Sequence, residues 1–275
     1  MTYETNRIYT GDCLDILPHF AGMAKLIMTS PPYPGQKNDT RTVGEWLEWF
    51  GVVAVRMYDA LQPNGVAVVN VMFKRTDEGW FDMRLFTEVP YIMDVAGFNC
   101  IDVYPFLKMN PAPNGANGEK TRTDIPAWEP VFVFTKAEQA DDYFFAPVRK
   151  PYKPKSMAKN GTVYSTRGDA IRPHPAGARQ PNYLMVSTSG SSRTRIPRAQ
   201  GQSYPVEVPE RFILQHTEPG DLVIDPFAGV GTTCKVARDN GRDYVGIEIL
   251  ADEAEKARRW LARPYQKKIV ELAYF

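Results

Sequence analysis

Residues Asp225–Thr233 have the sequence Asp-Pro-Phe-Ala-Gly-Val-Gly-Thr-Thr, and they separate a β-branched run from a stretch that is typical of a helix. The β-branched run 222–224 before them predicts a short, buried parallel strand. The residues after them, Cys234–Asn240, predict a helix that Gly241 terminates. A strand, a glycine turn and a helix in this order place main-chain N–H groups at the carboxyl edge of a sheet, where open α/β folds bind ligands.

The next predicted strand, Tyr244–Ile247, ends in Glu248. A carboxylate at that strand tip is placed to accept hydrogen bonds from ribose hydroxyls. The pattern is not the dinucleotide-binding fingerprint, because Cys234 occupies the third glycine position, and no Gly-Lys-Ser/Thr of a phosphate loop occurs. Taken alone, Gly229 and Gly231 would favour an ordinary αβ turn.

A second unusual turn, Ser30-Pro31-Pro32-Tyr33, follows a strand predicted at Lys25–Thr29. Its two prolines end the strand and remove two N–H donors, while their carbonyls can still accept hydrogen bonds. The alternative is a surface turn with a packing tyrosine. Together with the glycine turn, the rigid and acceptor-rich loop predicts a functional site.

A third candidate lies near the N-terminus, where a strand is predicted at Arg7–Tyr9. It is followed by Thr10-Gly11-Asp12-Cys13. Asp12 either caps the helical turn that follows or contacts a ligand at the strand tip.

The remaining pattern alternates strands and helices. Helices are expected at 45–61, at 84–96 with an interruption at Pro90, and at 251–262; strands are expected at 65–72, 99–109 and 130–135. This alternation predicts an α/β fold with a doubly wound, mostly parallel sheet and an antiparallel hairpin at one edge.

Composition places the chain among globular proteins, since its 275 residues are 43% hydrophobic. The polar N-terminal residues predict no signal peptide, and no apolar run is long enough to span a membrane. Three distant cysteines indicate a reducing, cytoplasmic setting without disulfides. Three scattered histidines show no metal-binding spacing.

The net charge of +1 is unevenly distributed along the chain. Residues 149–200 contain eleven Lys or Arg and a single acid, Asp169, together with six prolines and interleaved tyrosines. This composition predicts a basic insertion at 137–203 that binds nucleic acid, between a first half at 1–136 and a second half at 204–275. A disordered basic linker is the alternative.

The two turns together resemble motifs of the S-adenosylmethionine-dependent DNA amino-methyltransferases. Their order, with the proline turn first, then the insertion and then the glycine turn, is similar to the β group of that family. The resemblance implies a Rossmann-like methyltransferase fold, S-adenosylmethionine as cofactor and double-stranded DNA as partner. It also allows a homodimer and a separately acting restriction endonuclease. It assigns catalysis to Ser30, Pro31, Pro32 and Tyr33, and cofactor binding to Asp12, Cys13, Asp225, Phe227, Gly229, Gly231, Thr232, Thr233 and Glu248.

The residue types fit that chemistry. An exocyclic base amine is a weak nucleophile, because its lone pair is delocalised into the ring. Acceptors on its N–H groups, here the Ser30 hydroxyl and the Pro31 carbonyl, would localise the lone pair, and Tyr33 would stack on a base flipped from the duplex. Cytosine-C5 methylation normally uses a cysteine after proline, and no cysteine of this chain follows one.

In the family that the chain resembles, Ser at the head of the proline turn usually accompanies cytosine-N4 methylation, and Asp or Asn accompanies adenine-N6 methylation. Ser30 therefore favours cytosine N4. Three alternatives remain open: adenine-N6 methylation on the same fold, methylation of RNA or protein, and a nucleic-acid-binding protein without catalysis.

Overall fold

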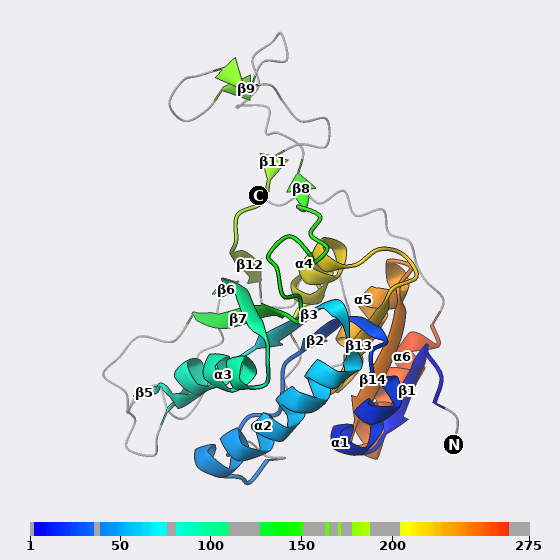
Figure 1. Ribbon diagram of the computed structural model, residues 1–275. Helices are drawn as coiled ribbons and strands as arrows, with labels where there is room; N and C mark the ends of the chain where they lie inside the picture. The colour runs from blue at the N-terminus through cyan, green and yellow to red at the C-terminus, as the bar shows by residue number, and fades with distance from the viewer. Residues whose placement is uncertain are drawn as a thin grey trace.

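The centre of the computed structural model is one eight-stranded sheet (Figure 1). The structure describes residues 3–35, 39–75, 81–109, 127–150, 163–164, 170–171, 178–187 and 204–263. Across the sheet the order is β1 (Arg7–Thr10), β14 (Asp243–Glu248), β13 (Leu222–Asp225), β2 (Ala24–Thr29), β3 (Leu61–Asn70), β7 (Trp128–Thr135), β6 (Asn99–Met109) and β12 (Leu184–Ser187).

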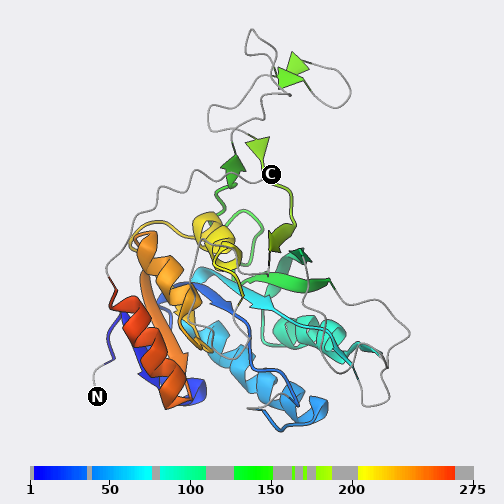
Figure 2. The ribbon, with the colours of Figure 1, turned by 180° about the vertical axis from the view of Figure 1, so that it is seen from behind.

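Helices cover both faces of this sheet (Figures 1 and 2). One face carries α1 (Cys13–Ile16), the 3₁₀ turn η1 (Leu17–Phe20), α2 (Val43–Ala60) and α3 (Arg84–Val95); the other carries α4 (Glu207–His216), α5 (Thr232–Asp239) and α6 (Ala251–Leu261). Alternate residues of β2 serve the two separate cores: Ile27 belongs to one, and Leu26 and Met28 belong to the other. This is the pattern of a strand buried on both sides, and it confirms the predicted doubly wound architecture.

Only β7 runs against its neighbours in this sheet, since it is antiparallel to both β3 and β6 while every other adjacent pair is parallel. The predicted antiparallel hairpin is thus the pair β6–β7. The outermost strand, however, is β12, which comes from the predicted insertion and pairs with β6 from Leu184↔Phe106 to Ser187↔Met109.

The predicted interruption of the third helix is wrong, because α3 continues through Pro90. Proline has no N–H to donate, so one i→i−4 hydrogen bond is missing there. Leu85, Val89 and Met93 are fully buried on the two sides of Pro90. Their packing against the sheet holds the two halves of the helix in line, since tertiary contacts supply most helical stability.

Helix α2 begins two residues before its predicted start because Thr42 caps it. The Thr42 Oγ1 accepts from the Glu45 main-chain N–H at 3.3 Å, and Glu45 Oε2 accepts from the Thr42 N–H at 2.8 Å. This is a capping box, which satisfies two donors that a helix start leaves open. It fixes the first turn of α2.

Of the predicted insertion at 137–203, the structure describes residues 137–150 and 178–187 and two short pieces between them. Near its start, the Ala146 N–H donates to the Gln215 carbonyl of α4 at 2.8 Å. Further out lie the antiparallel pairs β8 (Arg149–Lys150) with β11 (Ala178–Arg179), and β9 (Val163–Tyr164) with β10 (Ala170–Ile171), while β4 (Lys74–Arg75) pairs with β5 (Phe81–Asp82) elsewhere (Figure 1). The three-part division of the chain remains a prediction.

His216, at the end of α4, anchors the start of that insertion. Its Nδ1 lies 3.2 Å from the Phe144 carbonyl oxygen, and its ring packs near Phe145 and Phe212. Burial lowers the pKa of His216 to about 4, so the ring is neutral at pH 7. The role of this histidine is therefore structural.

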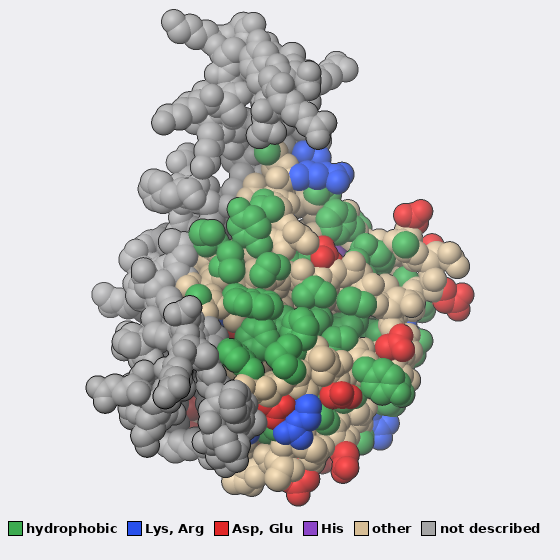
Figure 3. Space-filling view, turned by 90° about the vertical axis from the view of Figure 1, so that its left-hand side faces the viewer, with side chains coloured by type: hydrophobic (Ala, Val, Ile, Leu, Met, Phe, Trp, Pro, Cys, Tyr) green, Lys and Arg blue, Asp and Glu red, His purple; other side chains and the backbone are tan. Residues whose placement is uncertain are grey.

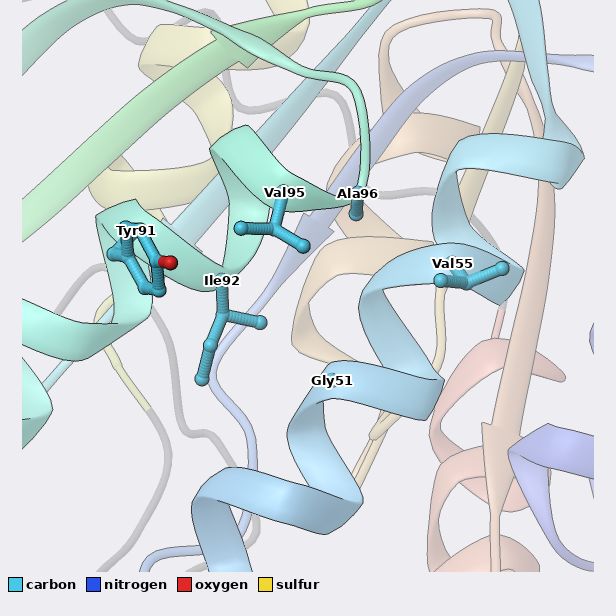
Figure 4. Close-up of a pocket in the computed structure, with 6 residues that line it drawn as sticks. All are labelled: Gly51, Val55, Tyr91, Ile92, Val95 and Ala96. Atoms are coloured by element: carbon cyan, nitrogen blue, oxygen red, sulfur yellow. The ribbon is translucent and has the colours of Figure 1, made fainter.

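An apolar surface lies on the side that carries α3 and the β6–β12 edge (Figure 3). Tyr91 and Val95 of α3 are 63% and 69% exposed. They also line a pocket of about 150 Å³ between α2 and α3, together with Gly51, Val55 and Ile92 (Figure 4). The pocket includes none of the predicted site residues. Within the described ranges, no helix is both long and apolar enough to cross a membrane.

Candidate active site

The predicted site residues lie at the ends of four adjacent parallel strands, β1, β14, β13 and β2. Thr10 pairs with Glu248, and Asp225 pairs with Gly246. Ser30–Tyr33, the proline loop, leaves β2 beside Asp225–Thr233, the glycine loop, which leaves β13. The chain proceeds outward in opposite directions from β2 and β13, so both loops open at the switch point of the sheet.

Asp225 joins the two loops. It is 3% exposed and accepts hydrogen bonds from Thr29 Oγ1 at 2.7 Å, from Thr233 Oγ1 at 2.6 Å and from the Phe227 N–H at 3.1 Å. Burial raises the pKa of Asp225 to about 6, and these hydrogen bonds hold it from rising further. Because Thr29 immediately precedes Ser30, one carboxylate fixes the start of both loops.

The two glycines of the glycine loop have different roles. Both have positive φ, at 51° for Gly229 and 84° for Gly231. A Cβ on Gly231 would lie 3.1 Å from the Ala257 Cβ, so this glycine permits close packing of α6. A Cβ on Gly229 would meet nothing within 4 Å. Gly229 therefore leaves open space at the sheet edge, which a ligand can approach.

Glu248 points its carboxylate at the glycine loop. Its Oε2 accepts from the Gly229 N–H at 2.8 Å and its Oε1 from the Leu250 N–H at 2.8 Å. Burial raises the pKa of Glu248, while these N–H groups lower it. A carboxylate has about four acceptor positions, so both oxygens can still accept from a ligand.

Asp12 caps α1, where its Oδ1 accepts from the Leu14 N–H at 2.9 Å. The Gly11 N–H beside it donates to the Glu248 carbonyl at 3.0 Å, which brings the β1 tip to the same edge. The Cys13 thiol is buried in the apolar core, and burial raises its pKa to about 12. A contact from Cys13 to a ligand would therefore come from its main chain.

The proline loop is held from behind. Tyr33 is 9% exposed, and its hydroxyl donates to the Asn70 carbonyl at 2.8 Å and lies 2.7 Å from Ser30 Oγ. The Trp46 indole N–H donates to the Pro32 carbonyl at 2.5 Å. The Pro32 oxygen is thus already engaged, and the Pro31 carbonyl and Ser30 oxygen are the better candidates for accepting from a ligand.

Sequence reasoning missed four residues of this site: Thr29, Trp46, Asn70 and Tyr204. The Tyr204 hydroxyl lies 2.5 Å from Thr233 Oγ1 and 3.5 Å from Asp225 Oδ2, so the residue that follows the insertion reaches the glycine loop. The position of Thr29 and Asn70 at strand ends was a usable signal. Trp46 carried none, since only packing brings it to the proline loop, whereas Tyr204 precedes a helix that the family resemblance places beside the glycine loop.

A line of side chains also runs from the segment after the proline loop to the glycine loop. Asp39 is buried and pairs with Arg41 at 2.5 Å. The Arg41 guanidinium lies 3.7 Å from the centre of a Trp49 ring, and Trp49 packs against Phe227 at 5.4 Å between ring centroids. These contacts support Phe227 from the side of α2.

Comparison with known proteins points to one group. The model of a family described as DNA methylase matches residues 24–259. The type II methyltransferase M.BglII of Bacillus subtilis is 29% identical over 89% of this chain, which spans 65% of the length of that protein. The type II methyltransferase M.PvuII of Proteus hauseri is 27% identical over 90% of this chain and 81% of its own.

Solved structures share the fold. The PvuII DNA methyltransferase, described as cytosine-N4-specific, superposes with a TM-score of 0.71 at 24% identity over 98% of this chain and 90% of its own. The complex of M1.HpyAVI with SAM gives a TM-score of 0.59 at 23% identity over 94% of this chain and 99% of its own. A shorter match, 40% identical over 124 residues, is to the DNA adenine methyltransferase YhdJ of Escherichia coli K12, over 38% of this chain and 42% of that protein.

Proposed function

Because the chain belongs to the N6/N4 DNA methylase family, we propose that it transfers a methyl group from S-adenosylmethionine to the exocyclic N4 of a cytosine in DNA. One observation carries the proposal. The Thr29–Asp225 hydrogen bond of 2.7 Å holds the acceptor-rich proline loop beside the glycine loop, at the edge where this fold class binds ligands.

The glycine loop fits S-adenosylmethionine. Gly229 leaves room where a side chain would stand, and the Glu248 carboxylate at the next strand tip can accept from ribose hydroxyls. Asp225 supplies a negative charge beneath the loop, which favours a cationic ligand. When bound, this cofactor supplies a methyl group on a positively charged sulfur. Asp12, Cys13, Phe227, Thr232 and Thr233 remain proposed contacts from the same strand tips.

The proline loop would prepare the amine. The Ser30 oxygen and the Pro31 carbonyl accept from its two N–H groups, which localises the nitrogen lone pair. In that arrangement the nitrogen would bond to the methyl carbon in line with the methyl–sulfur bond that breaks, the cofactor would leave as a neutral thioether, and one amine proton would pass to water. The protein contributes positioning and electrostatics, and no covalent enzyme intermediate is needed.

Cytosine N4 is supported by Ser30 at the head of the proline loop. Adenine N6 is the second candidate, and the 40% match to a DNA adenine methyltransferase favours it. Mass spectrometry of nucleosides, after incubation of mixed-sequence DNA with the purified protein and cofactor, distinguishes them. N4-methylcytosine is the expected product; N6-methyladenine alone would overturn the target base and leave the reaction type intact.

Double-stranded DNA is the proposed partner, bound through the basic segment 149–200. Arg149 and Arg179 of the described pairs β8 and β11 belong to that segment. A restriction endonuclease that shares the target sequence, and a homodimer, are also proposed. The apolar surface around Tyr91 and Val95 offers a place for association between copies. Light scattering of the purified protein, with and without DNA, measures the oligomeric state directly.

A further inference from the structure

The hydrogen bonds behind the proline loop determine which way the Ser30 proton points. A tyrosine hydroxyl has one proton to donate. The Tyr33 hydroxyl donates it to the Asn70 carbonyl at 2.8 Å, and a carbonyl can only accept. In the 2.7 Å contact between Tyr33 and Ser30, the donor is therefore Ser30. The protons follow one direction, from Ser30 to Tyr33 to the main chain of β3.

We propose that Tyr33 is a positioning residue whose hydroxyl takes the Ser30 proton, so that Ser30 can only accept from the target amine. A free serine hydroxyl rotates and can serve as donor or acceptor. As a donor it would bond the amine nitrogen through its lone pair and make that nitrogen less nucleophilic. The chain of hydrogen bonds removes this unproductive arrangement before the base arrives. The inference rests on the proposed function and assigns Tyr33 a role besides stacking on the base.

The surroundings make this arrangement rigid. Asn70, which supplies the terminal acceptor, is 2% exposed, and its side-chain amide donates to Glu129 Oε2 at 3.3 Å and to the Pro130 carbonyl at 3.4 Å. Trp46 is fully buried, stacks on Phe50 at 4.9 Å and pins Pro32 through its indole N–H. Pro32 and Tyr33, the second half of the proline loop, are thus fixed by groups that the solvent does not reach.

The raised pKa of Tyr33 is consistent with this direction of the hydrogen bonds. Burial and the nearby Glu129 raise the pKa of Tyr33, while hydrogen bonds from Ser30 and from the Met72 main chain lower it less strongly. The hydroxyl is therefore protonated at neutral pH. At that pH Ser30 keeps its role as an acceptor from the target amine.

The test is Tyr33→Phe in the full-length protein, because phenylalanine keeps the ring for stacking and removes only the hydroxyl. We expect the single-turnover rate on a DNA substrate to fall about tenfold, with the affinity for S-adenosylmethionine unchanged. The matched control is Tyr104→Phe, which removes another buried hydroxyl; Tyr104 lies on β6 and accepts from Gln215 Nε2 at 3.1 Å. That variant should methylate at the parental rate.

A double variant separates this role from a general structural one. Without the Ser30 oxygen the orientation of its proton no longer matters, so Tyr33→Phe should slow the Ser30→Ala variant by less than twofold. The inference would be overturned if the rate losses of the two substitutions multiplied in the double variant, or if Tyr33→Phe were as fast as an active parent. Either result would leave the proposed function intact. A parent protein that methylates no DNA would overturn the proposed function, and with it the catalytic meaning of the hydrogen bonds. Non-additive unfolding free energies of the same variants would report the interaction itself without any activity.

Discussion

The proline loop and the glycine loop are neighbours with opposite electrostatic character. The glycine loop depends on two carboxylates, Asp225 and Glu248, whose pKa values burial raises. The proline loop uses hydroxyl and carbonyl groups, and its tyrosine stays neutral. A cationic cofactor benefits from fixed negative charge, whereas a neutral amine needs acceptors that do not take its proton. The two halves of the site should therefore respond differently to mutation and to acid.

The largest expected effect comes from the proline loop. Ser30→Ala removes an acceptor that acts on the reacting amine and should lower kcat by roughly 100- to 1000-fold, similar to the loss of one oxyanion-hole donor. Calorimetric affinity for S-adenosylmethionine should stay within about twofold, because the glycine loop is untouched. An equal loss of cofactor affinity would show that the two loops do not divide the work in this way.

The glycine loop should show the converse. Glu248→Ala removes a charged acceptor at the strand tip and should weaken cofactor binding by about 1.5–3 kcal/mol. Glu255→Ala serves as control, since this carboxylate pairs with Arg258 and Arg259 on the outer surface of α6. Isothermal calorimetry measures both variants. If Glu248→Ala bound S-adenosylmethionine with the parental affinity, Glu248 would not be a cofactor-binding residue.

The contribution of Asp225, in the glycine loop, to the unfolding free energy should depend on pH. Its folded pKa of about 6 exceeds the ordinary value of 3.8, so its contribution to stability is greatest below pH 3.8 and is lost as pH rises through 6. Two pKa units correspond to about 3 kcal/mol. Asp225→Asn should recover about 1–2 kcal/mol of unfolding free energy at pH 7.5, because some hydrogen-bond geometry is sacrificed.

The gain from Asp225→Asn should shrink as pH falls from 7 to 4, when the parental carboxyl becomes protonated. His216 acts in the opposite direction, because its lowered pKa makes the protein lose stability as pH falls through 6.5 towards 4. Denaturant titrations of parent and variant at each pH cancel the contribution of the histidine. A difference that does not vary with pH would mean that Asp225 titrates normally.

Substitutions in the basic insertion should have the smallest effect on the two loops. Replacing Arg193, Arg195 and Arg198 by Gln should lower the slope of log affinity against log salt by about 0.9 for each phosphate that is no longer neutralised, as measured by fluorescence anisotropy with duplex DNA. These arginines lie outside the described residues. Cofactor affinity should be unchanged, and an unaltered slope would favour a basic linker over a DNA-binding segment.

Much of this site could be predicted because its motifs are local. A β-branched run followed by Pro-Pro or by Gly-x-Gly predicts a strand and a turn from a few neighbouring residues, and the strands that lead into Ser30 and Pro226 lie where expected. Pro90 misled the prediction, since the tertiary packing of Leu85, Val89 and Met93 overrides a local helix breaker. The Thr42–Glu45 capping box was readable in the sequence and marks a start that periodicity alone placed too late.

The sequence by itself determined the chemical groups of the site and the elements that carry them, because turn residues and side-chain periodicity act over a few positions. Only the tertiary structure decided which groups meet. Strand order places β13 beside β2, so Thr29 reaches Asp225 across 196 positions of chain, and Tyr33 reaches Asn70 on β3. The direction of the Ser30 proton depends on that second hydrogen bond. It is a property of the folded sheet, since no pattern of neighbouring residues specifies a hydrogen bond between strands.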